Sequence, residues 1–202
     1  MFVLFTVWGY DVTGLEFASV ILALIAIGLG IRGTRWAWPF YFVASLLYSV
    51  LFVQFDLFAS AAMQSIFMVS AVWGWFAWGR DGVRVPSRLS PRWRIIGAVG
   101  VIVLWALLAP VLQSIGGVAT RGDAFMLVGS LAGQLLMVGQ KTESWAVWLV
   151  VNIVGAVLYA SQGLYFTSLF YGVLIVMAGI GWREWSARAA ARAESLSAPA
   201  HA

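Results

Sequence analysis

The chain contains no cysteine, a single histidine and few charged residues, and each shortage excludes a class of function. Without cysteine there is no disulfide framework, no thiol nucleophile and no thiolate metal site. The one histidine, His201, lies in the C-terminal tail, which argues against a histidine metal centre or proton relay. Charged residues make up 10% of the chain and hydrophobic residues 62%, whereas a soluble domain carries about 25% charged residues. The sequence therefore predicts an integral membrane protein.

Charged side chains are also missing from the middle of the apolar segments. Acidic residues near these segments lie at their edges: Glu16, Asp56, Asp123 and Glu143. A proton pump or symporter normally needs a titrating group within the membrane, and a seven-helix retinal protein needs a lysine in its last helix. Nucleophile–base pairs and paired carboxylates are missing too. The sequence thus predicts neither an enzyme nor a bound cofactor or metal.

Seven apolar segments are each close to the ~20 residues that a helix needs to cross a bilayer. We expect them at about residues 14–31, 37–55, 58–79, 94–113, 123–140, 144–161 and 164–182. The predicted fold is therefore all-α, with seven transmembrane helices. Met1 to Trp8 lack the basic region of a cleaved signal peptide, and we expect an interfacial segment there, with Trp8 and Tyr10 at headgroup depth.

The basic residues indicate how the helices are oriented. If the segments alternate in direction, eleven of the 12 lysines and arginines fall on one side and only Arg121 on the other. Because the side richer in lysine and arginine is normally cytoplasmic, we expect the N-terminus outside and the C-terminus inside. The basic residues lie between apolar segments, so a pI near 9.9 does not indicate nucleic-acid binding.

The first three and last three segments echo each other at an offset of about 107 to 111 positions. The matches are Glu16 with Asp123, Arg32-x-x-x-Trp36 with Lys141-x-x-x-Trp145, Tyr48 with Tyr159, residues 56–60 with 163–167, and Trp75-x-x-Trp78 with Trp182-x-x-Trp185. A fourth helix between two three-helix units makes the repeats parallel. This predicts a 3+1+3 arrangement like that of SWEET-type sugar facilitators, with a solute site at the membrane midplane between the halves.

This arrangement divides the chain into four parts. Residues 1–79 hold the N-terminal segment and the first repeat, and residues 80–122 hold a basic cytoplasmic loop and the linking helix. The second repeat takes residues 123–185. Residues 186–202 form a cytoplasmic tail, which we expect to be a short helical extension that frays into disorder.

The sixth segment carries an unusual polar face. Trp145, Trp148 and Asn152 stand at positions i, i+3 and i+7, so a helix presents them on one side. Asn152 lies at about mid-depth, where an unsatisfied amide is costly. Indole faces stack on flat heterocycles, and carboxamides pair with hydroxyls and amides. These groups suit a planar, polar, largely uncharged solute such as a nucleoside or vitamin.

Structural roles compete with this interpretation. An intramembrane glutamine or asparagine can simply bond a neighbouring helix, and tryptophans at helix ends are usually interfacial anchors. We favour the anchor role for Trp36, Trp38, Trp73, Trp75, Trp78, Trp182 and Trp185, and the pocket role for Trp148. Gln64 and Tyr171 occupy matching positions 107 apart, as in a pseudo-symmetric pocket.

The stretch from Glu143 through Trp145-x-x-Trp148-x-x-x-Asn152 resembles the WxxWxxxN/D signature of the PnuC-type vitamin transporters. Arg35–Pro39, Gly74-Trp75-x-x-Trp78 and Gly181-Trp182-x-x-Trp185 extend the resemblance, which runs from about Leu15 to Trp185. It implies a 3+1+3 fold in a bacterial inner membrane and facilitated diffusion of nicotinamide riboside toward NAD synthesis. It also implies a substrate site of Trp145, Trp148 and Asn152, with Gln64, Gln134 and Tyr171 as neighbours.

Several alternatives stay open from the sequence. Relatives in this family import thiamine or riboflavin with closely related motifs. Asn152 is neutral, which favours hydrogen bonding to an amide or a ribose of the solute. Aromatic faces could instead hold a pyridinium or thiazolium by cation–π attraction of up to about 2 kcal/mol. A small-sugar facilitator and a seven-helix sensor without transport are the other classes. Uniport would need a cytoplasmic kinase that traps the substrate, a partner implied by the family, and homo-oligomerisation is left undecided.

Overall fold

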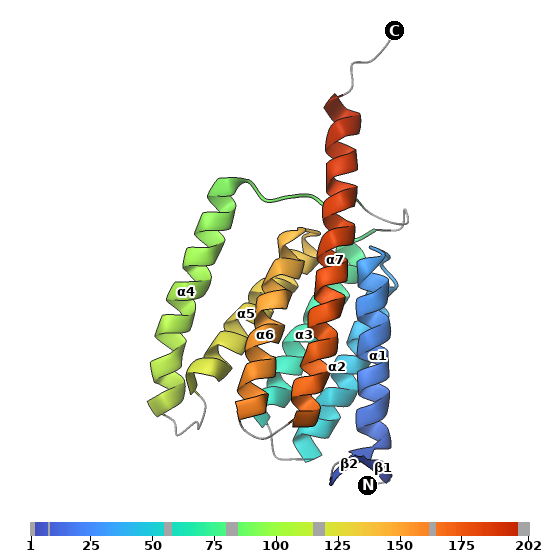
Figure 1. Cartoon of the computed structure of the whole chain (residues 1–202), viewed down its shortest axis with the longest axis vertical. Coiled ribbons are helices and arrows are strands. Elements are labelled where there is room, and N and C mark those ends of the chain that lie inside the picture. The colour runs from blue at the N-terminus through green and yellow to red at the C-terminus, as the bar shows by residue number, and fades with distance from the viewer. Residues whose placement is uncertain are drawn as a thin grey trace. The chain divides into compact units, whose positions relative to one another are not determined.

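The computed structural model describes residues 3–7, 9–54, 58–79, 85–114, 120–161 and 165–197. Within these ranges a two-stranded hairpin precedes seven helices (Figure 1). The strands are β1 (Val3–Val7) and β2 (Tyr10–Thr13). The helices are α1 (Gly14–Ile31), α2 (Ala37–Gln54), α3 (Phe58–Ala77), α4 (Pro91–Ser114), α5 (Thr120–Val138), α6 (Glu143–Ser161) and α7 (Tyr165–Ser197).

The helices confirm the predicted all-helical membrane fold. Their ends lie within three residues of the predicted segments, except that α7 continues to Ser197 and so includes the expected helical extension of the tail. Among the described residues, α1, α2, α4 and α6 are long and apolar enough to cross a membrane. The apolar stretches Met63–Ala77 of α3 and Ala124–Val138 of α5 are shorter.

The N-terminal hairpin was not predicted. Strands β1 and β2 pair antiparallel around Gly9, whose φ of +79° suits the turn. The Thr6 hydroxyl donates a hydrogen bond to Asp11 at 2.5 Å. The chain then enters α1 through Thr13, whose hydroxyl oxygen accepts the Glu16 N–H at 3.2 Å as an N-cap. Trp8, one of the expected headgroup anchors, lies outside the described residues.

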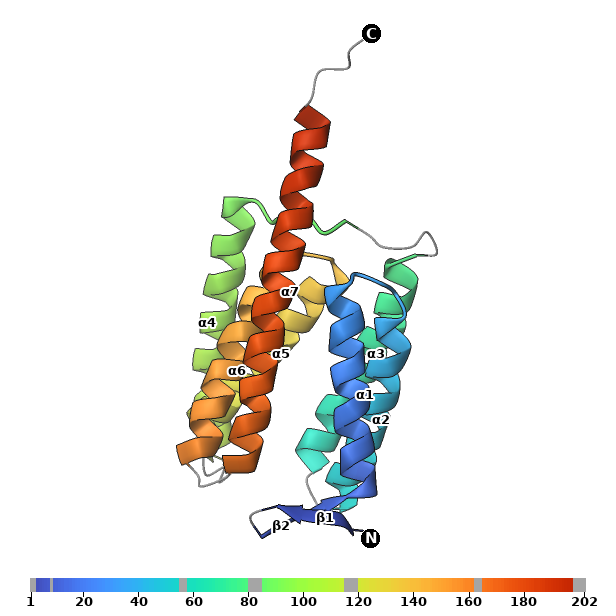
Figure 2. The ribbon, with the colours of Figure 1, turned by 45° about the vertical axis from the view of Figure 1, so that its right-hand side comes forward.

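The described helices form two units, residues 1–84 and 85–202. In the first unit α2 packs on both α1 and α3, and in the second α6 packs on both α5 and α7 (Figure 2). Helix α4 packs on α5. The boundary between the units falls inside the basic stretch that the sequence places between the two halves.

One tryptophan arrangement occurs in both units. In the first, Trp38 of α2 lies against Gly74 of α3 and meets Trp78 edge-on, with ring centroids 5.1 Å apart. In the second, Trp145 of α6 lies against Gly181 of α7 and meets Trp185 edge-on at 5.6 Å. Each pair of equivalent residues is 107 positions apart. The shared offset is therefore 107.

The interfacial-anchor prediction was wrong for three of these tryptophans. Trp38, Trp78 and Trp185 are each only 1% exposed, because they pack between helices: Trp38 lies against Gly74 and Trp78, and Trp185 lies against Trp145. Trp36, Trp73 and Trp182 are instead 59%, 54% and 43% exposed, as an anchor requires. At the offset of 107, Trp145 corresponds to Trp38 and not to Trp36, and Tyr48 corresponds to Gly155 and not to Tyr159.

Candidate functional site: the buried face of α6

A short segment before α4 holds the turn from which α6 begins. We call residues 85–90 the strap. The Ser87 N–H donates to the Gln140 carbonyl at 3.0 Å, and the Thr142 N–H donates to the Ser87 carbonyl at 3.0 Å. The Lys141 ammonium adds a hydrogen bond to the Ser87 hydroxyl at 2.8 Å. The turn just before α6 is thus paired through its backbone to a segment some fifty positions earlier.

Glu143, in the first turn of α6, fixes the other end of the strap. Its carboxylate oxygens accept the Leu89 N–H at 3.1 and 3.2 Å. Arg94 of α4 donates to the same carboxylate through Nε at 2.9 Å and Nη2 at 2.8 Å. A carboxylate is also favourable at a helix N-terminus, where the backbone N–H groups point outward. The start of α6 is therefore held by both the strap and α4.

Trp145 follows two residues later and faces α7. Its side chain is 2% exposed, and a Cβ added at Gly181 would lie only 2.5 Å from its ring. Its indole nitrogen, like that of Trp38, is buried without a hydrogen-bond partner among the described residues. Because the two repeats share this feature, the close ring packing accounts for it in both places. Trp145 therefore has a packing role whatever else it does.

Trp148, one turn deeper, faces α5. A Cβ added at Gly133 would lie 3.0 Å from its indole, so the two helices approach closely at this level. The residue after Gly133 is Gln134, which is buried with 7% exposure. Helix α5 therefore carries a buried amide directly after the glycine on which the Trp148 indole packs.

Asn152 and Tyr171 lie near the middle of the same unit. The Asn152 side chain is 5% exposed. Tyr171 of α7 packs its ring on Gly155, three positions after Asn152, and its ring centroid lies 5.2 Å from that of Tyr159. Five of the six predicted site residues thus lie on the packed helices α5, α6 and α7. Gln64 lies half-buried on α3 of the first unit.

The first unit offers a comparison for each of these positions. Trp145, Gly181 and Trp185 have identical counterparts in Trp38, Gly74 and Trp78. Trp148 and Asn152 instead correspond to Tyr41 and Ser45, and Tyr171 corresponds to Gln64. The residues of the tryptophan–glycine contact are therefore identical in the two units, whereas Trp148, Asn152 and Tyr171 of the candidate site have different counterparts. Sequence reasoning missed the packing set, although glycines 74 and 181 at the common offset were a visible signal.

Comparison with known proteins assigns the family. A family model described as nicotinamide mononucleotide transporter matches residues 13–187. The nicotinamide riboside transporter PnuC of Escherichia coli is 27% identical over 207 residues, covering 88% of this chain and 87% of the relative. The riboflavin/roseoflavin transporter RibM of Streptomyces davaonensis is 29% identical over 175 residues, covering 82% and 81%. These relatives are transporters and not enzymes.

The fold agrees with this assignment. A crystal structure of the vitamin B3 transporter PnuC matches with a TM-score of 0.73 at 18% identity, covering 88% of this chain and 82% of that chain. At this identity the likeness concerns the fold alone. The family model extends from the N-cap of α1 to beyond the Trp185 contact on α7. The chain therefore belongs to the nicotinamide mononucleotide transporter family, as its resemblance to the PnuC-type proteins predicted.

Proposed function

We propose that the chain imports nicotinamide riboside by facilitated diffusion and so supplies NAD synthesis. The observation that carries this proposal is the buried polar face of α6, where Asn152 is 5% exposed and shares a helix face with Trp148. An indole can stack on the nicotinamide ring, and a carboxamide can pair with its amide or with a ribose hydroxyl. The name of the Escherichia coli relative supports this substrate.

The proposed substrate site takes Trp145, Trp148 and Asn152 from α6, Gln134 from α5 and Tyr171 from α7, with Gln64 from α3 completing it. We further propose that two parallel three-helix repeats joined by α4 build this 3+1+3 transporter. The identical tryptophan–glycine contacts at an offset of 107 support the repeat.

Transport is proposed to be uniport, with no coupling ion. Asn152 is neutral, and the apolar segments carry no charged side chain near mid-depth. Net import would then depend on a cytoplasmic kinase that converts the imported substrate to a charged phosphate. The distribution of basic residues supports an inner-membrane location with the N-terminus outside and the C-terminus in the cytoplasm.

Riboflavin is the second candidate substrate, because RibM is a riboflavin/roseoflavin transporter of comparable similarity. A flavin is also planar and amide-bearing, so stacking and amide pairing would serve it equally well. The two candidates differ in ring area and in the charge of the ring.

Uptake by the purified protein in liposomes tests these proposals together. We expect saturable uptake of labelled nicotinamide riboside, competed by the unlabelled compound and weakly by riboflavin, thiamine or sugars. Ionophores that collapse proton or sodium gradients should leave the uptake unchanged. Stronger competition by riboflavin would select the second candidate, and ionophore-sensitive accumulation would overturn uniport. Absence of flux for the whole panel would favour a sensor.

A further inference from the structure

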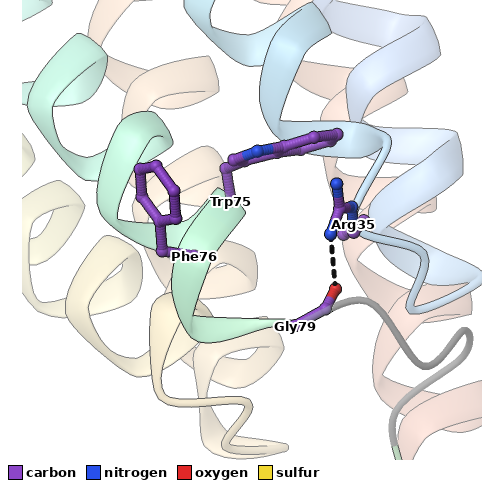
Figure 3. A pocket seen from close by; sticks show the side chains of 4 residues that line it. All are labelled: Arg35, Trp75, Phe76 and Gly79. Atoms are coloured by element: carbon purple, nitrogen blue, oxygen red, sulfur yellow. Dashed lines mark hydrogen bonds between the residues drawn. The ribbon is translucent and has the colours of Figure 1, made fainter.

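A cavity of about 220 Å³ lies at the end of α3 in the first unit, and none of its lining residues belongs to the candidate substrate site. It is lined by Arg35, Trp75, Phe76 and Gly79 (Figure 3). Arg35 belongs to the turn between α1 and α2, and the other three residues belong to the last turn of α3 and its continuation. Figure 3 shows the indole of Trp75 extending toward Arg35, with Gly79 below them and Phe76 on the opposite side.

The arginine in this cavity is held in place, and among the described residues only one of its donors makes a hydrogen bond. Its guanidinium carbon lies 3.6 Å from the centroid of the Trp75 ring, and its Nη1 donates to the Gly79 carbonyl at 3.1 Å. A guanidinium has five N–H donors in a fixed plane. Among the described residues no carboxylate forms an ion pair with it. The cation is thus oriented by neutral groups and keeps donors for an anion.

The surface around the cavity is aromatic and exposed. Trp36 meets the Trp75 ring edge-on at 5.3 Å and is 59% exposed, while Trp73 and Phe76 are 54% and 74% exposed. Such rings at the ends of apolar helices are typical of the membrane–water boundary. A fixed cation beside exposed apolar rings matches an amphiphile with an anionic head.

We propose that this cavity binds the phosphate of an anionic phospholipid, with phosphatidylglycerol as the test compound. Arg35 donates to the phosphate oxygens, which suit its planar fork, and the acyl chains lie along the exposed rings. The second unit has Thr142 at the position of Arg35, although Trp182 matches Trp75. The cation is therefore not required for repeat packing, which favours a ligand as the reason for its position.

Native mass spectrometry of the purified full chain tests the proposal. Phosphatidylglycerol and phosphatidylcholine with the same acyl chains are added separately to the wild type and to Arg35→Gln, Arg35→Lys and Arg183→Gln. Arg183 is the matched control, being exposed and next to Trp182. We expect the wild type and the control to bind phosphatidylglycerol at least tenfold more tightly than phosphatidylcholine. Arg35→Gln should reduce that preference to within twofold, and Arg35→Lys should fall between.

The proposal is overturned if the wild type binds the two lipids equally, or if Arg35→Gln keeps the wild-type preference. It is also overturned if inorganic phosphate at millimolar concentration removes the lipid completely, because the site would then be one for free phosphate. Should Arg35→Gln fail to fold, the wild type, Arg35→Lys and the control decide the outcome.

Discussion

At the scale of single residues, Asn152 differs from Trp145 and Trp148, both of which pack an indole against a glycine of a neighbouring helix. Removing the Asn152 amide deletes no packing contact of the tryptophan–glycine kind, so Asn152→Ala should fold normally. It should bind the substrate roughly 5- to 150-fold more weakly, because leaving a ligand's polar group without a partner costs about 1–3 kcal/mol and 1.4 kcal/mol is tenfold in affinity. Binding by calorimetry and thermal unfolding in detergent measure the two effects.

Ile153→Ala is the control for that experiment, since Ile153 is 45% exposed on the same helix. Trp148→Ala should behave like Asn152→Ala in binding. If both Trp148→Ala and Asn152→Ala bound substrate at wild-type strength while remaining folded, the substrate site would lie elsewhere.

Two of the three glycines of α7 provide a sharper residue-scale prediction about packing. In Gly181→Ala the added methyl would lie 2.5 Å from the Trp145 ring, whereas in Gly172→Ala it would meet nothing within 4 Å. Overpacking a well-packed contact costs about 1–3 kcal/mol, while alanine is favoured over glycine within a helix by about 1 kcal/mol. We expect Gly181→Ala to lower the thermal midpoint and Gly172→Ala to leave it unchanged or raise it. Equal midpoints for the two variants would contradict the tight contact.

At the scale of elements, the start of α6 depends on the strap. Glu143→Ala removes the acceptor of the Leu89 N–H and the partner of Arg94. Because the Arg94 side chain is 47% exposed, the ion pair itself should contribute no more than about 1 kcal/mol. The main effect should be local, with amide hydrogen exchange in residues 87–89 about tenfold faster.

The matched control for the strap is Glu184→Ala on α7, whose carboxylate is 4.0 Å from Arg188 and 55% exposed. It should leave exchange in the strap unchanged. Unaltered exchange at Leu89 in Glu143→Ala would mean that the carboxylate does not hold this segment.

At the scale of the whole molecule, the hydropathy of the chain predicted the helices because the bilayer sets their length. Hydropathy does not show whether the apolar groups around a tryptophan belong to lipid or to protein. For this reason the burial of Trp38, Trp78 and Trp185 was not predicted. The hairpin was not predicted because its strands have only five and four residues and depend on pairing with each other. The resemblance on α6 predicted the family and the candidate residues. Their packing on glycines could not be predicted, because it depends on how the helices lie against each other.

The end of α7 gives a prediction at this scale. Residues 191–196 are exposed, whereas Trp185 is 1% exposed and touches Trp145. A chain ending after Arg192 should therefore keep the wild-type thermal midpoint and uptake. A chain ending after Glu184 loses an indole from the core and should unfold at a clearly lower temperature, since truncating a buried tryptophan costs about 3–5 kcal/mol. Equal stability of the two truncated chains would contradict the packing role of Trp185.

The length of α7 has a mechanical consequence. Its 33 residues make a rod of about 50 Å at 1.5 Å per residue, whereas the hydrocarbon core of a bilayer is about 30 Å thick. A tilt of about 10° around the Tyr171–Gly155 contact would move Ser195 by roughly 6 Å, because some 24 residues of rigid helix separate the two points. The exposed end of α7 is thus a lever that magnifies small rotations in the membrane, and a spin label at Ser195 would read them out during transport.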